Sequence, residues 1–238
     1  MTVIFKDVEY TPQGTQVLGP VTVELSEKRI GIVGRNGSGK SSFARLLAGL
    51  IVPDAGNVAI AGVDVAKDRK NAVSTVGIIF QNPDHQIIFP TVGEEMAFGL
   101  QQMGVPRAGA AEKAALVLSE HGRAHWFDRS THDLSQGQRH FVCLMSVLAM
   151  EPKTIVLDEP YAGLDIPTSM QLHNWLDGLD QQIILITHDP AVLSDFDRVL
   201  WLEAGRIAGD GAAKSVLKTF VTEMKRLGES DARTDISA

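Results

Sequence analysis

The sequence has almost no cysteine, few basic residues and no long apolar run. Its single cysteine, Cys143, forms no internal disulfide, which suits a reducing compartment. The first residues lack the apolar stretch of a secretory signal, and no apolar stretch approaches about 18 residues, so we expect no direct insertion into a membrane. The formal net charge is −7, which argues against a broad basic face for nucleic acid.

What the sequence does contain is a phosphate-binding pattern of the form G-x-x-x-x-G-K-S. It lies between an apolar strand pattern at 29–33 and a helical pattern that follows it. Glycines let successive N–H groups turn around phosphate oxygens, and the helix N-terminus adds its positive dipole end. Lys40 reaches the β/γ-phosphates, and the Ser41 hydroxyl normally completes a Mg²⁺ shell. The pattern predicts a nucleoside triphosphate site at Gly34, Arg35, Asn36, Gly37, Ser38, Gly39, Lys40, Ser41 and Ser42.

Two adjacent acids, Asp158 and Glu159, follow the apolar run 154–157. In an open parallel sheet the ligand lies at the carboxyl ends of the strands. Asp158 is therefore placed to hold Mg²⁺, directly or through water, and Glu159 to polarise an attacking water. A guanine-reading Asn-Lys-x-Asp is absent from the sequence, which argues against a GTPase.

The remaining apolar patterns predict an α/β chain of 238 residues with an inserted helical part. The runs 154–157 and 183–186 are continuously apolar, as in parallel strands that are covered on both faces. Other strands are expected at 3–5, 17–25, 29–33, 58–60, 76–80, 198–202 and 205–207, the last two as a hairpin. Helices are expected at about 40–50, 94–103, 107–118, 136–150 and 212–227.

A further motif, Leu134-Ser135-Gln136-Gly137-Gln138, begins a predicted helix, and we refer to it as the signature turn. Ser135 is a plausible N-cap, and the exposed N–H groups form a second anion site. Together with the motifs above, Ala162-Gly163-Leu164-Asp165 and His188, it makes the chain resemble the nucleotide-binding domains of ABC ATPases over about residues 3–208. In the usual Leu-Ser-Gly-Gly-Gln the first glycine stands where this chain has Gln136.

The resemblance implies a P-loop NTPase fold of the ABC ATPase type: a RecA-like α/β core, an antiparallel β subdomain and an inserted helical subdomain. The expected ABC ATPase domain covers 2–228, with its core at about 2–80 and 152–228, the helical subdomain at about 82–150 and a polar tail at 229–238. It also implies an ATP-loaded homodimer in which each ATP lies between one P-loop and the partner's signature turn. The implied roles are catalysis for Glu159, His188 and Gln81, Mg²⁺ binding for Ser41, Gln81 and Asp158, contact in trans for Ser135, Gly137 and Gln138, and a dimer loop at Asp165.

The family usually stacks adenine on an aromatic residue near the end of the first strand. That position falls on Pro12 here, with Tyr10 two residues earlier. Tyr10 either stacks on the base or packs on the sheet, and the sequence leaves both open. The preference for ATP is therefore implied by the family.

The segment 82–99, which follows Gln81, looks like the extra short helix and acidic run of ATPases from energy-coupling-factor importers for vitamins and transition metals. Ile87, Ile88 and Phe89 would form an apolar lip in which a partner helix is buried. The alternative is a loop that packs on its own subdomain. The resemblance implies a transmembrane coupling protein and a substrate-binding membrane subunit as partners, and a peripheral place on the cytoplasmic face of the inner membrane.

Within that group the chain looks most like the ATPases of biotin transport, which resemble it in the Leu-Ser-Gln-Gly-Gln variant of the signature turn and in the short part that follows the helix expected at 212–227. Cobalt or nickel import is the alternative, because no residue here touches the cargo. A soluble ABC ATPase of an assembly complex is a further alternative.

Overall fold

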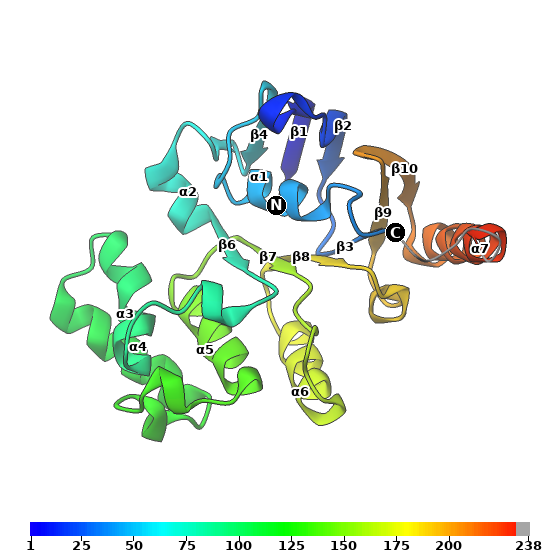
Figure 1. The fold of residues 1–238 in the computed structure, drawn as a ribbon. Coiled ribbons are helices and arrows are strands. Elements are labelled where there is room, and N and C mark those ends of the chain that lie inside the picture. Colours follow the sequence, from blue (N-terminus) through cyan, green and yellow to red (C-terminus); the bar gives the residue numbers. More distant parts are fainter. Residues whose placement is uncertain (232–238) are drawn as a thin grey trace.

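The computed structural model describes residues 1–231, and its centre is a six-stranded sheet in the order β10-β9-β3-β8-β7-β6 (Figure 1). All neighbours in this sheet are parallel except β9 and β10, which form the expected hairpin. Every residue of β7 and β8 is buried, as the continuous apolar runs predict. The strands are β3 Arg29–Gly34, β6 Val76–Ile79, β7 Thr154–Asp158, β8 Gln182–Thr187, β9 Arg198–Glu203 and β10 Arg206–Gly211.

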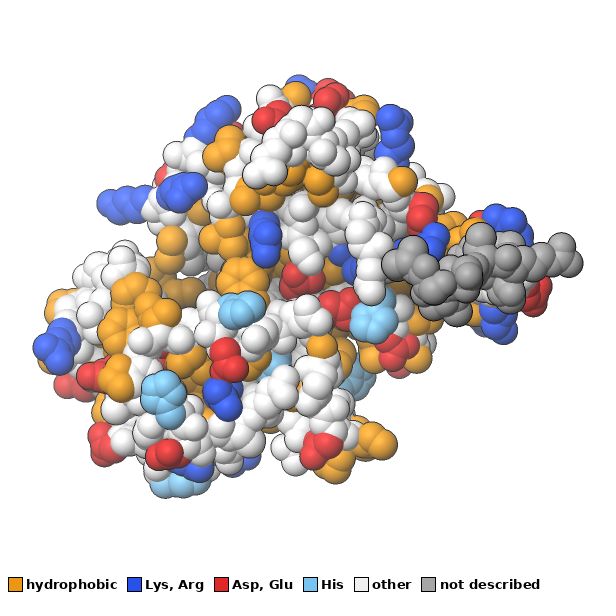
Figure 2. All heavy atoms as spheres, in the orientation of Figure 1, with side chains coloured by type: hydrophobic (Ala, Val, Ile, Leu, Met, Phe, Trp, Pro, Cys, Tyr) orange, Lys and Arg blue, Asp and Glu red, His pale blue; other side chains and the backbone are white. Residues whose placement is uncertain are grey.

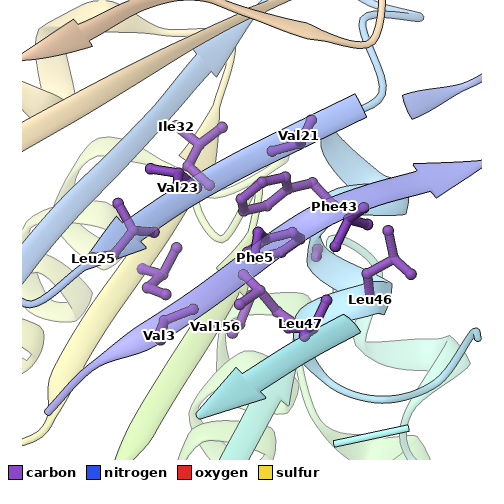
Figure 3. Close-up of a cluster of buried hydrophobic side chains, with 14 of the residues drawn as sticks. Val3, Phe5, Val21, Val23, Leu25, Ile32, Phe43, Leu46, Leu47 and Val156 are labelled. Carbon is purple, nitrogen blue, oxygen red and sulfur yellow. The ribbon is translucent and has the colours of Figure 1, made fainter. Parts of the chain in front are cut away.

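A second, antiparallel sheet has the order β2-β1-β4-β5. Its buried side chains and those of helix α1 (Lys40–Leu47) belong to one hydrophobic cluster, in which Phe5 stacks on Phe43 at 4.2 Å between ring centroids (Figure 3). This packing holds the start of α1 against both sheets. The strands of this sheet are β1 Val3–Tyr10, β2 Leu18–Leu25, β4 Ala55–Ile60 and β5 Val63–Asp64.

Three helices form a region on the left of Figure 1, and the last of them also packs against the six-stranded sheet through Cys143, Leu144 and Val147. They are α3 (Val92–Gln102), α4 (Arg107–Glu120) and α5 (Gln136–Ala149), each within a few residues of its predicted range. Their inward faces form a hydrophobic cluster of their own, which includes Met96, Leu118 and Met145. Cys143 is a buried side chain of α5, and burial raises the pKa of its thiol.

The helices α2 (Arg69–Thr75) and α6 (Ile166–Asp177) are absent from the sequence-based expectations. Helix α7 runs over Ala213–Asp231 and so includes the first residues of the expected polar tail, whereas 232–238 lie outside the described residues. Within residues 1–231, no helix combines the length and apolarity needed to cross a membrane. Single 3₁₀ turns cover Pro12–Gly14, Pro83–His85, Ala124–Trp126, Thr131–Asp133 and Pro190–Leu193.

Candidate functional site

The phosphate-binding loop connects β3 to α1, as the sequence predicts. Gly34 has no room for a side chain, because an added Cβ would lie 2.3 Å from the Leu202 carbonyl oxygen and 2.6 Å from Ser38 Oγ. Gly39 immediately precedes the helix and has a φ of 99°, a conformation that L side chains rarely adopt. The sequence therefore fixes both the path of this loop and the direction in which α1 begins.

Lys40 is buried in the loop, with only 7% of its surface exposed. Its Nζ donates to the Gly34 carbonyl at 2.8 Å and to the Arg35 carbonyl at 3.0 Å. Burial lowers the pKa of Lys40, and the nearby carboxylates of Glu159 and Asp158 act against that shift. The ammonium group therefore sits beside the loop, with neighbouring carboxylates that favour its charge.

Asp158 ends β7 beneath the loop and is also 7% exposed. Burial raises the pKa of its carboxyl group, against which a hydrogen bond from Ser41 acts. Within the described part of the chain, Asp158 Oδ1 is buried without a hydrogen-bond partner. An unsatisfied carboxylate oxygen beside a serine hydroxyl suits Mg²⁺, which prefers oxygen ligands and keeps several of its waters. The residues present therefore fit the expected cation.

Glu159 has a φ of 52°, so its backbone is left-handed, which costs a non-glycine residue about 1–3 kcal/mol. Its N–H donates to the Ile186 carbonyl at 2.8 Å, which ties the turn after β7 to the end of β8. Its carboxylate is held on both sides: Oε2 accepts from Thr187 Oγ1 at 3.0 Å, and Oε1 lies 2.8 Å from His188 Nδ1. The sequence did not predict the contact with Thr187, although its place before His188 was the available signal.

Lys40 and Glu159 line one open hollow of about 480 Å³, which we call the nucleotide hollow. The predicted residues Gly34, Arg35, Ser38 and Asp158 do not line it. It brings together predicted residues from the loop, from the turn after β6, from the end of β7 and from the end of β8. Val17 also lines it and was not predicted, whereas Tyr10 packs against the first hydrophobic cluster. The lining residues are Val17, Asn36, Gly37, Gly39, Lys40, Ser41, Ser42, Gln81, Glu159 and His188.

The signature turn does not line the nucleotide hollow of its own chain. Ser135 caps α5 in a capping box: its Oγ accepts from the Gln138 N–H at 3.2 Å, and Gln138 Oε1 accepts from the Ser135 N–H at 3.0 Å. Gly137 approaches α6 so closely that an added Cβ would lie 2.7 Å from Thr168 Cγ2. Asp165 caps α6 by accepting the Thr168 N–H at 2.9 Å. The signature turn and Asp165, which are both predicted to contact the partner subunit, therefore lie next to each other on one chain.

The predicted lip (Ile87, Ile88 and Phe89) is only partly exposed. Ile88 is 66% exposed, but Ile87 is half-buried against the cluster around β7 and β8, and the Phe89 ring lies 5.0 Å from that of Phe98. On one side of Ile88 is an apolar hollow of about 320 Å³, along the junction between the helical region and the sheets, where Figure 2 shows hydrophobic atoms at the surface. Its apolar lining includes Leu50, Val73, Ile78, Ile88, Phe98 and Met150.

The sequence of the chain is similar to those of known proteins. A family model described as ABC transporter matches residues 18–162. The biotin transport ATP-binding protein BioM of Rhodobacter capsulatus is 54% identical over 92% of this chain and 94% of its own length. The energy-coupling factor transporter ATP-binding protein EcfA of Methanothermobacter thermautotrophicus is 35% identical over 90% of this chain and 71% of its own length.

Two solved structures have the same fold. CbiO1 from Clostridium perfringens, described as part of the ABC transporter complex CbiONQ, aligns with a TM-score of 0.77 and 28% identity over 98% of this chain and 95% of its own. A dimeric ATP-binding cassette in a post-hydrolysis state, bound to ADP and phosphate, aligns with a TM-score of 0.78 and 24% identity over 89% of this chain and 98% of its own.

Proposed function

The chain belongs to the ABC transporter ATP-binding family, and on that premise we propose that it is the ATP-hydrolysing subunit of an energy-coupling-factor importer that takes up biotin. One observation carries the chemistry: Glu159, held by Thr187 and His188, faces the same hollow as the phosphate-binding loop. A carboxylate fixed beside a phosphate cradle is placed to orient water for attack on the terminal phosphate.

In this proposal the β- and γ-phosphates of ATP lie on the loop N–H groups and on Lys40, whose ammonium exchanges carbonyl oxygens for phosphate oxygens. Ser41, Asp158 and Gln81 would hold Mg²⁺, which neutralises phosphate charge when bound. Glu159 accepts a proton from the attacking water, and His188 fixes the Glu159 carboxylate and contacts the γ-phosphate. The base of ATP lies toward Val17, since Val17 lines the hollow and Tyr10 does not.

We further propose that two copies close head to tail around two ATP molecules. Ser135, Gly137 and Gln138 then reach the partner's ATP, and Asp165 crosses the interface. The exposure of Ser135 and Gln136, outside the nucleotide hollow of their own chain, supports this arrangement. In this proposal the core covers about 2–80 and 152–228 and the helical subdomain about 82–150.

The proposed membrane partners are a transmembrane coupling protein and a substrate-binding subunit, with this chain peripheral on the cytoplasmic face. The apolar hollow beside Ile88 supports this, since a partner helix could bury its apolar face there. Biotin as cargo is supported by the 54% identity to BioM. The likeness to CbiO1 keeps cobalt or nickel as the second candidate.

Uptake of labelled cargo tests this function. Cells that carry the transporter operon with and without this gene are given labelled biotin or labelled cobalt. We expect biotin uptake to require the gene and to be lost with Glu159→Gln. Gene-dependent uptake of cobalt alone would move the assignment to the metal importers. If the chain stays in the soluble fraction when the membrane proteins are coexpressed, the alternative of a soluble assembly ATPase replaces the transport proposal.

A further inference from the structure

The segment between β6 and α3 is attached at its beginning to the sheet. Gln86 folds back toward the end of β6, where its Oε1 accepts the Phe80 N–H and its Nε2 donates to the Ile78 carbonyl, both at 3.3 Å. Because β6 is the edge strand of the sheet, the Gln86 amide takes the two hydrogen-bonding positions that a further neighbouring strand would have taken. As a result, the residue that directly precedes the lip is held in a fixed position relative to β6.

The end of the lip is attached to the helical region by a different residue. Glu95, on the first turns of α3, is 7% exposed, and its Oε2 accepts the N–H groups of Ile88 and Phe89, both at 2.9 Å. Hydrogen bonds to a carboxylate are roughly twice as strong as those between neutral groups. The backbone at the exposed Ile88 is therefore held in a fixed position relative to α3.

A third contact joins the same segment to α5. Arg139 NH1 lies 2.6 Å from Asp84 Oδ1, four residues before Ile88 in the chain. Arg139 follows the signature turn directly, so this ion pair connects the lip segment with the helix that begins there. The segment thus has attachments to β6, α3 and α5, and Gln81 of the nucleotide hollow lies just before it.

We propose that Gln86 and Glu95 are positioning residues that attach the two ends of the lip to different parts of the molecule. Ile87 is then the single residue between the two attachments. Ile88 moves with the helical region in this proposal. A rotation of the helical region relative to the sheets therefore displaces Ile88 from the opposite wall of the apolar hollow, which Leu50, Val73 and Ile78 form. This inference rests on the proposed function, because it makes the partner surface change with the relative position of the two regions.

The attachments are tested first in the free chain, by hydrogen exchange of the lip amides. In wild type, the Ile88 and Phe89 amides should be protected. Glu95→Ala should make them exchange at least about tenfold faster, while Glu95→Gln, which keeps one acceptor oxygen, should restore part of the protection. Glu94→Ala removes the neighbouring exposed carboxylate and is the matched control. Unchanged exchange in a folded Glu95→Ala protein would show that Glu95 does not hold the lip.

The second measurement is the amount of biotin transported per ATP hydrolysed by the complete complex in vesicles. Glu95→Ala and Gln86→Ala should each lower this ratio by at least about fivefold, with the ATPase rate of the free chain within about twofold of wild type. Gln86→Ala should leave the Ile88 and Phe89 amides protected. A normal ratio in both variants overturns the proposal. A wild-type complex that hydrolyses ATP but does not move biotin refutes the proposed cargo instead, and the exchange data still decide the attachments.

Discussion

Glu159 Oε1 and His188 Nδ1 lie 2.8 Å apart, although the two residues are 29 positions apart in the chain. The contact exists because β7 and β8 are adjacent parallel strands that end at the same edge of the sheet. Thr187 holds the other carboxylate oxygen, so the carboxylate has one orientation toward the nucleotide hollow.

Glu159→Gln should keep ATP binding and lower turnover by at least about a hundredfold, since a positioned base contributes roughly 10²–10⁴ in rate. The glutamine keeps the size of the side chain but cannot accept the proton. The variant should accumulate as an ATP-bound dimer, measured by size-exclusion chromatography beside single-turnover kinetics. Wild-type turnover in this variant would remove Glu159 from the mechanism.

Lys40→Ala should lose most of its ATP affinity, because the missing ammonium contacts phosphate in the ground state as well as in the transition state. Lys28→Ala is the matched control: its side chain is 52% exposed and forms a surface ion pair with Asp180. Binding of a fluorescent ATP analogue to both variants is the measurement. Normal binding by a folded Lys40→Ala protein contradicts the phosphate-cradle assignment.

Mixed dimers test the composite site. A dimer of one Lys40→Ala chain and one Ser135→Arg chain has one site with both changes and one with neither, so it should recover activity that both parent proteins lack. The arginine should block closure because the Ser135 side chain caps the turn that faces the partner's phosphate in the proposed dimer. A mixture that stays inactive, although mixed dimers are isolated by two different affinity tags, excludes independent composite sites.

Ile88→Asp should detach the chain from its membrane partner. Ile88 is 66% exposed, so the substitution should change the melting temperature of the free chain by only a few degrees. Burial of an isoleucine side chain contributes about 1.5–3 kcal/mol, so co-purification should fall at least about tenfold. Leu116→Asp on α4, where the leucine is 58% exposed, is the control. Phe89→Ser would be a less specific test, because it would also remove the ring contact between Phe89 and Phe98.

Asp158→Asn should stabilise the nucleotide-free chain at neutral pH while removing Mg²⁺-dependent hydrolysis. Burial raises the pKa of Asp158 in the folded protein, so the folded chain binds more protons than the unfolded chain between about pH 4 and the raised value. Stability therefore falls as pH rises through that window, and the loss persists at pH 7. Between pH 4 and pH 8, the melting temperature of the variant minus that of the wild type should increase as pH rises. If this difference in melting temperature does not change with pH, ionisation of the buried Asp158 does not destabilise the folded chain.

The predicted phosphate-binding loop, Gln81, Glu159 and His188 line one hollow because these motifs lie where strands end, and parallel strands bring their ends together. Helix α6 was not predicted, since Ile166 and Met170 are exposed and interrupt the apolar periodicity; only Leu172 and Leu176 are buried. The available signal was Asp165 as N-cap with Pro167 in the first turn. The half-buried state of Ile87 and Phe89 depends on contacts with other elements of the structure, which local periodicity does not contain.

The capping box at the signature turn has a consequence for reversibility. In the free chain Ser135 and Gln138 satisfy each other, so no backbone donor of that pair is left unpaired for a partner. The Ser135 hydroxyl only accepts in this cap, so its own proton stays available to a phosphate of the other subunit in the proposed dimer. The helix end therefore keeps the same backbone with and without the phosphate. A turn that needs no rebuilding in either direction can bind and release a phosphate in repeated cycles of closing and opening.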